Sequence, residues 1–162
     1  MVNNQVIIDL QLACKNLNGL PNQKMFQTWI YNIFATYRKK IELTVRIVDK
    51  KEMRYLNWYY LGKNYPTNVL SFPFTPPSIV TSPLLGDIVL CRQVIEYESK
   101  QNNVPSQSHW AHMTIHGSLH LLGYNHIFDK EAMLMKQVEI SILRKCGYKR
   151  CCYIKHRSFK YL

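Results

Sequence analysis

The sequence predicts an α+β domain, with one small mixed β-sheet of about four strands packed with five or so helices. Short segments of alternating polarity indicate the strands, and apolar residues repeated at helical spacing indicate the helices. The two kinds of segment follow in the order strand, helix, strand, helix, two strands and three helices. Because no internal repeat or linker interrupts this order, residues 1–148 are expected to form a single domain, followed by a basic C-terminal tail at 149–162.

The first half of the chain alternates strands and helices. Residues 5–12 (QVIIDLQL) are rich in β-branched residues and alternate in polarity, which predicts a strand. Residues 22–39 carry apolar side chains at helical spacing and predict a helix with one face against the sheet. Alternation returns at 42–48, a second strand. A helix follows over 49–60, where the first residue is an aspartate that can cap it and Gly62 ends it.

The second half contains two more strands and then only helices. Strands are predicted at 69–74 and 87–91, and the proline-rich sequence TPPSIVTSP between them predicts a loop. From residue 92 onward the pattern is helical. Breaks near Pro105, at Gly123 and at Gly147 divide this region into three helices.

The composition predicts a cytoplasmic protein that binds a polyanion. No apolar run reaches the roughly 20 residues that span a bilayer, so no membrane association is expected. The net charge of +11 favours partners such as RNA. No acidic residue follows Glu139 while lysines and arginines continue, so the tail is either a contact for RNA or the ribosome or simply a lysine-rich surface.

The five cysteines are odd in number and lack CxxC spacing, which indicates reduced thiols. Cys151 and Cys152 are adjacent in the basic tail. They are read either as a soft metal site or as two free thiols in a solvated segment.

The segment HGSLHLLGYNH, residues 116–126, has the spacing of a metal site. His116 and His120 project from one face of a helix, about 6 Å apart along its axis. Gly123 permits a left-handed backbone that ends the helix and lets the chain return His126 to the same point. Three imidazoles with a fourth position open to water are typical of catalytic zinc. We therefore expect one Zn²⁺ on these three histidines, which act in catalysis through metal-bound water.

Two neighbouring residues limit this prediction. His112 continues the helical stripe, but it lies about 12 Å along the axis from His120, too far for both to share an ion with His116. It is expected to contact a ligand or the substrate, or only to pack. Gly117 stands where zinc proteases of the pattern HExxHxxGxxH carry their general base. This glycine argues against peptide hydrolysis and leaves room for substrate or for a closely packed strand.

Three motifs together resemble the YbeY family of bacterial endoribonucleases. They are HWAHMTIHGSLHLLGYNH, GKNYPTNVLSFPF and LLGDIVLCRQVI, and the similarity runs from Val6 to about Tyr148. The resemblance implies a zincin-like α+β fold and a metal site at His116, His120 and His126. It also implies single-strand-specific endoribonuclease activity in 16S ribosomal RNA 3′-end maturation, late 30S assembly and 70S ribosome quality control. The implied partners are ribosomal RNA, the 30S subunit, the GTPase Era and a small-subunit ribosomal protein.

The chain departs from the family pattern at two positions. Leu61 replaces an arginine that would bind the scissile phosphate, and Asn125 replaces an aspartate before the third histidine. Lys63 is a candidate substitute as a phosphate contact. These departures motivate an alternative: a ribosome-associated assembly factor whose zinc is structural or vestigial, with little or no turnover.

The motif PTNVLSF supplies further candidates. Ser71 is a candidate catalytic residue, and with Asn68 and Thr67 it is a candidate for lining the substrate cleft. The other interpretation of these three polar residues is ordinary strand and turn chemistry.

Overall fold

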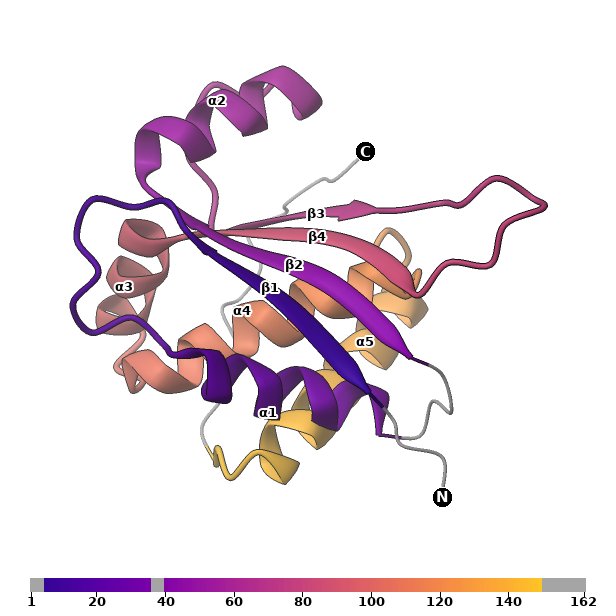
Figure 1. Cartoon of the computed structure of the whole chain (residues 1–162). Coiled ribbons are helices and arrows are strands. Elements are labelled where there is room, and N and C mark those ends of the chain that lie inside the picture. The colour runs from indigo at the N-terminus through magenta and orange to yellow at the C-terminus, as the bar shows by residue number, and fades with distance from the viewer. Residues whose placement is uncertain (1–4, 36–39, 150–162) are drawn as a thin grey trace.

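The computed structural model describes residues 5–35 and 40–149, which form a mixed four-stranded sheet packed with five helices (Figure 1). The predicted fold class is therefore confirmed. The elements in chain order are β1 (Val6–Leu12), α1 (Gln23–Phe34), β2 (Ile41–Val48), α2 (Lys50–Leu61), β3 (Val69–Pro73), β4 (Leu84–Cys91), α3 (Arg92–Gln101), α4 (Ser106–Leu121) and α5 (Asp129–Lys145).

The sheet has the order β1-β2-β4-β3. Strands β1, β2 and β4 run parallel, whereas β3 is an edge strand antiparallel to β4. Helices α1, α4 and α5 lie on one side of the sheet and α2 lies on the other (Figure 1). The helix with the histidine motif is thus separated from α2 by the sheet.

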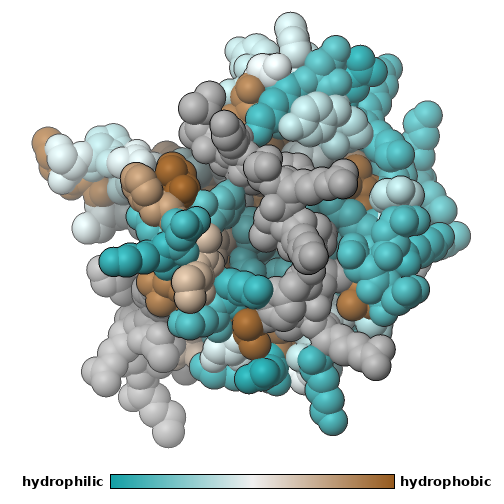
Figure 2. Space-filling view, turned by 180° about the vertical axis from the view of Figure 1, so that it is seen from behind, coloured by the Kyte–Doolittle hydropathy of each residue, from teal (hydrophilic) through white to brown (hydrophobic). Residues whose placement is uncertain are grey.

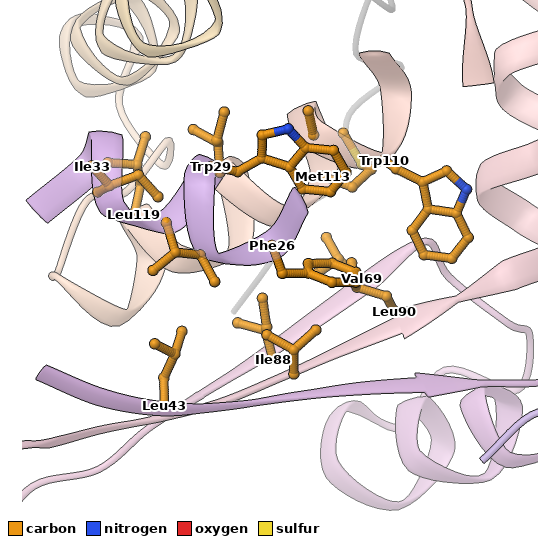
Figure 3. Close-up of a cluster of buried hydrophobic side chains, with 14 of the residues drawn as sticks. Phe26, Trp29, Ile33, Leu43, Val69, Ile88, Leu90, Trp110, Met113 and Leu119 are labelled. Carbon is orange, nitrogen blue, oxygen red and sulfur yellow. The ribbon is translucent and has the colours of Figure 1, made fainter. Parts of the chain in front are cut away.

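The main hydrophobic core fills the space between the sheet and the helices α1, α4 and α5 (Figure 3). Helix α1 points Phe26 toward the sheet, where it lies near Ile88, and Trp29 toward Met113 of α4, which also contributes Trp110. A smaller cluster lies on the α2 side and consists of Val48, Met53, Leu70, Val89 and Cys91. Consecutive side chains of β3 point to opposite faces of the sheet, so Val69 packs in the main core and Leu70 in the smaller cluster.

Most predicted boundaries agree with the structure to within a few residues. Helix α1 is capped by Asn22, whose side chain accepts a hydrogen bond from the Met25 amide at 3.0 Å. Its predicted extension over 36–39 lies outside the described residues. Strand β4 begins at Leu84 and not at 87, because β2 pairs with it from Glu42 onward and a register shift follows that residue.

The segment before α2 differs in detail from the prediction. Asp49 occupies the N-cap position, but its side chain does not cap the helix. The carboxylate instead accepts hydrogen bonds from Gln93 Nε2 at 2.5 Å and from the Lys15 amide at 2.9 Å, and these bonds lower its pKa. Gly62 ends α2 as predicted, in the left-handed conformation with φ +68°.

The remaining predictions concern surface and termini. Among the described residues, no helix is both long and apolar enough to cross a membrane. Figure 2 shows a face on which hydrophobic residues are scattered among hydrophilic ones. Residues 150–162, with Cys151, Cys152 and most of the basic tail, lie outside the described part of the chain.

Candidate metal centre

Helix α4 and the turn after it bring three histidines together. His116 and His120 lie one turn apart on α4, which ends at Leu121. Gly123 follows with φ +91°, and the Tyr124 amide donates back to the Leu119 carbonyl at 3.1 Å. This turn places His126 beside the other two, so that one ring nitrogen of each lies within 4.8 Å of the others. The predicted convergence of the three rings is present.

The hydrogen bonds of the first two rings determine which nitrogen faces inward. His116 Nδ1 donates to Glu139 Oε1 at 2.5 Å, and His120 Nδ1 donates to the Tyr124 carbonyl oxygen at 2.9 Å. A carboxylate and a carbonyl can only accept, so both Nδ1 atoms carry the proton. In the neutral rings, each Nε2 then has a lone pair. The two Nε2 atoms are 3.1 Å apart.

Burial keeps the second of these rings neutral. The pKa of His120 is lowered from 6.5 to about 4, first by desolvation and then by the neighbouring charges of His116 and His126. Near neutral pH, His120 therefore has no second proton to place between the two Nε2 atoms. The Nε2 lone pair of His120 is thus available to a proton donor or to a cation.

The donor set fits a zinc ion. Two ligands at about 2.0–2.1 Å from a tetrahedral zinc are about 3.3–3.4 Å apart, close to the distance between the two Nε2 atoms. Metal-bound histidines usually donate their other ring N–H to a carboxylate or a carbonyl, as His116 and His120 do here. The arrangement can thus hold one metal ion.

Glu139 of α5 is the residue that the sequence prediction missed. Its side chain is 6% exposed, and its second oxygen accepts a hydrogen bond from His112 Nε2 at 3.0 Å. Burial alone raises the pKa of Glu139, but the hydrogen bonds from His112 and His116 outweigh burial and lower it well below its usual range. One buried carboxylate therefore orients two histidines of α4. This contact also settles the position of His112, which lies beside the triad and not in it.

Gly117 permits α4 to lie against the sheet. A Cβ atom there would lie 2.9 Å from Val69 Cγ2, 3.1 Å from Ser71 Oγ and 3.2 Å from Ile88 Cγ2. The space beside Gly117, predicted to hold substrate or a closely packed strand, is filled by β3 and β4. A glutamate, the base of the zinc proteases, does not fit at this position without displacing the sheet.

The polar residues of the PTNVLSF motif lie in and around β3. Ser71 Oγ donates to the Gly117 carbonyl oxygen at 2.8 Å, which ties the edge strand to α4. Asn68 donates to the Glu98 carboxylate and accepts from the Val69 amide. Thr67 is buried, at 5% exposed. Their suggested roles in catalysis or in lining a cleft stay predictions.

The two positions that depart from the family pattern also have defined surroundings. Leu61 packs against the smaller cluster on the α2 side of the sheet. Asn125 Oδ1 accepts a hydrogen bond from the Ile127 amide at 3.0 Å, within the turn that carries His126. Lys63 follows the end of α2, where its amide donates to the Asn57 carbonyl at 3.2 Å. Its proposed phosphate contact stays a prediction.

Comparison with known proteins assigns the family. The sequence model described as "Endoribonuclease YbeY" matches residues 13–147, which include the triad and Glu139. The chain belongs to the YbeY family. Among curated relatives, an Endoribonuclease YbeY of Blochmanniella pennsylvanica is 75% identical over 157 residues, covering 97% of this chain and 100% of the relative. An Endoribonuclease YbeY of Blochmanniella floridana is 61% identical over 150 residues, covering 93% and 98%.

A solved structure supports the family fold. The solution structure of TM1509 from Thermotoga maritima matches with a TM-score of 0.55 and 21% identity, covering 86% of this chain and 92% of that one. At this level of identity the likeness concerns the fold alone.

Proposed function

We propose that this protein is a single-strand-specific, metal-dependent endoribonuclease with one Zn²⁺ on His116, His120 and His126. Its membership of a family described as endoribonucleases supports RNA cleavage, as does its identity to the two curated relatives. The metal identity and the preference for single strands go beyond those comparisons. The net charge of +11 is suited to a polyanionic substrate.

One observation carries the metal-dependent part of the proposal. The Nε2 atoms of His116 and His120 lie 3.1 Å apart while each Nδ1 donates elsewhere. With each Nδ1 engaged elsewhere, the Nε2 atoms are the ring nitrogens that remain to bind a cation. Three ring nitrogens within 4.8 Å of one another, two of them on rings oriented through their other nitrogen, are suited to bind one cation.

When bound, zinc supplies a Lewis acid and a means of activating water at neutral pH. The residues of the chain orient the metal ligands and contact the substrate. Glu139 and the Tyr124 carbonyl hold two ligand rings in the required tautomer and orientation. Ser71 holds the edge strand against the helix that carries the ligands. Lys63 is the proposed contact for a substrate phosphate, as a point charge and not as a bidentate fork.

The cellular role is proposed from the family. We place the protein in the cytoplasm, in 16S ribosomal RNA 3′-end maturation, late 30S assembly and 70S ribosome quality control. Its proposed partners are ribosomal RNA, the 30S subunit, the GTPase Era and a small-subunit ribosomal protein. Pull-down of tagged protein from native cells, with a His120→Ala variant in parallel, tests whether these partners are bound and whether binding needs an intact metal site.

The test of activity compares two histidines of the same helix. His120→Ala is expected to abolish both zinc binding and cleavage of single-stranded RNA. His109→Gln is the matched control, because His109 is buried on α4 outside the triad and its Nε2 contact with Glu98 at 2.7 Å can be kept by an amide. The control is expected to retain both properties. RNA cleavage by His120→Ala without bound metal would reject the proposed function.

A second candidate is an assembly factor that binds the ribosome with little or no turnover. It is favoured by Leu61, which packs in an apolar cluster where the family usually has an arginine. This reading predicts salt-sensitive binding to the small subunit and no cleavage by the native chain. Leu61→Arg should then produce or raise cleavage. A native chain that is fully active and unaffected by Leu61→Arg would exclude it.

A further inference from the structure

The outer face of α2 carries two parallel stripes that begin with cations and end with aromatic rings. Lys50, Arg54 and Trp58 form one stripe at four-residue spacing. The second stripe, one residue further along, consists of Lys51, Tyr55 and Tyr59. Residues four apart lie on the same side of a helix, so each stripe is continuous in space. We call these six residues the α2 stripes.

The aromatic ends of the stripes are exposed. Trp58 is 54% exposed, Tyr55 56% and Tyr59 63%. The rings contact one another, since Tyr55 and Tyr59 stack with centroids 5.9 Å apart and Tyr55 lies 6.3 Å from Trp58. They form a contiguous group of exposed aromatic rings.

The lysines at the start of the stripes do not stabilise the helix. Lys50 and Lys51 stand in the first turn, at the positive end of the helix dipole, where cations are unfavourable. Helix α2 attaches to the protein by its other face, through the buried residues Met53 and Asn57. Tyr60 packs on Phe72 of β3 and Tyr59 packs on Tyr60, but each ring of the stripes remains more than half exposed.

The cations of the stripes keep their charge available. The single acidic residue of α2, Glu52, is directed to Arg46 of β2, with an Nε to Oε1 distance of 2.8 Å. Arg54 donates to the neutral amide of Asn64. Within residues 5–35 and 40–149, neither Lys50, Lys51 nor Arg54 forms a salt bridge.

We infer that the α2 stripes bind single-stranded RNA, with bases stacked on Trp58, Tyr55 and Tyr59 and phosphates held by the cations. Aromatic rings interleaved with cations are the common means of binding single strands without reading their sequence. The inference rests on the proposed function, because it gives the RNA substrate a second contact away from the metal centre.

The position of the α2 stripes in the fold suggests the path that a bound RNA would take over the protein. α2 and α4 lie on opposite sides of the sheet, and β3 is its edge strand (Figure 1). In the proposed path, RNA that reaches both sites passes this edge. A hollow of about 360 Å³ between α2 and the sheet is lined in part by Glu52 and Asp87. Arg46 also lines the hollow and pairs with Glu52, so the hollow carries little net charge. The outer face of α2 carries the cations Lys50, Lys51 and Arg54 and is therefore the surface that suits the RNA.

The tryptophans of this chain allow a direct measurement. Of the three, Trp29 and Trp110 are 2% and 1% exposed, whereas Trp58 is on the stripes. Titration of the full-length, metal-free protein with single-stranded oligouridine should quench the Trp58 fluorescence and protect it from acrylamide. Duplex RNA of the same length should do neither. Unchanged acrylamide access at saturating oligouridine would overturn the inference.

Paired variants measure the contribution of the rings. Tyr59→Ala is expected to weaken oligouridine binding about 5- to 150-fold, the effect of losing one stacked base, and Tyr59→Phe should restore it. Tyr97→Ala is the matched control, because Tyr97 is 62% exposed but lies on α3 between two glutamates. It should leave binding unchanged. Equal effects of the two alanine variants would refute a specific platform.

The cations are tested by salt dependence. Lys51→Ala should reduce the slope of log affinity against log salt by about 0.7, as for the loss of one phosphate contact on a single strand. Folding of each variant is checked by circular dichroism. An unchanged slope would show that Lys51 contacts no phosphate and would contradict the inference.

The results also separate this inference from the proposed function. Oligouridine binding is measured without metal. A native chain that binds oligouridine through the α2 stripes but cleaves no RNA would therefore contradict the proposed nuclease function and not the inference about the stripes. If Tyr59→Ala and Trp58→Ala both bind oligouridine like the native chain, and Tyr59→Ala cleaves RNA normally, the nuclease function stands and RNA binding by the α2 stripes is refuted. If Trp58→Ala abolishes a dimer seen by analytical ultracentrifugation and leaves RNA binding intact, the stripes are a protein interface and the inference is wrong.

Discussion

Replacing Glu139 by glutamine tests how the metal centre is held in place. Both carboxylate oxygens are in use, Oε1 by His116 at 2.5 Å and Oε2 by His112 at 3.0 Å. Glutamine has one acceptor oxygen and an NH₂ group, so one of the two histidines loses its acceptor and faces a donor. A hydrogen bond to a charged group contributes about 1.5–3 kcal/mol, and the free energy of unfolding of the metal-free protein should fall by about that amount.

The effect on metal binding should be larger than the effect of a stability loss alone. Partners that orient ligand rings typically change metal affinity by about 10- to 100-fold when mutated, and we expect a loss in that range for Glu139→Gln. Zinc affinity is measured by competition with a chromophoric chelator and stability by urea denaturation.

The matched control is Glu98→Gln. Glu98 accepts a hydrogen bond from His109 Nε2 at 2.7 Å, so this substitution also disturbs a histidine of α4, but one outside the triad. It should lower stability and leave zinc affinity unchanged. Native zinc affinity in Glu139→Gln, or equal losses of affinity in both variants, would refute the role assigned to Glu139.

Two further predictions concern the fold around the site. Gly117→Ala should lower the free energy of unfolding by about 1–3 kcal/mol through overpacking against Val69 and Ile88, although alanine favours a helix; an equal or higher urea midpoint would contradict this. The metal-free protein should lose stability as the pH falls from 6.5 toward 4, because the unfolded chain there binds a proton that buried His120 does not accept. Below about 4.5 the lowered pKa of Glu139 adds a further loss in the same direction. Urea midpoints across this pH range check the trend, and His120→Asn should flatten its upper part.

The triad could be predicted from sequence because all its determinants are local. Helical spacing sets the relation of His116 to His120, and the left-handed turn at Gly123 returns His126. The distance along the helix between His112 and His120 likewise excluded His112 from the triad, in agreement with the structure. Element types were equally accessible, since alternation and helical periodicity are read within one segment.

Glu139 could not be found in this way because its partners come from another helix. A signal was nevertheless present: Glu139 lies on α5 at helical spacing from Met135, Ile142 and Leu143, all buried, and a carboxylate in an apolar stripe needs a partner. The order of the strands and the Asp49 contacts with Lys15 and Gln93 likewise depend on tertiary packing.

X-ray absorption spectroscopy of the zinc-loaded, full-length chain tests the metal centre most directly. Coordination by His116, His120 and His126 predicts a shell of nitrogen and oxygen atoms at about 2.0–2.1 Å with the multiple scattering of imidazole rings. The His120→Ala chain should not give this spectrum. A sulfur shell at about 2.3 Å in the native chain would place the ion on cysteines and contradict the account.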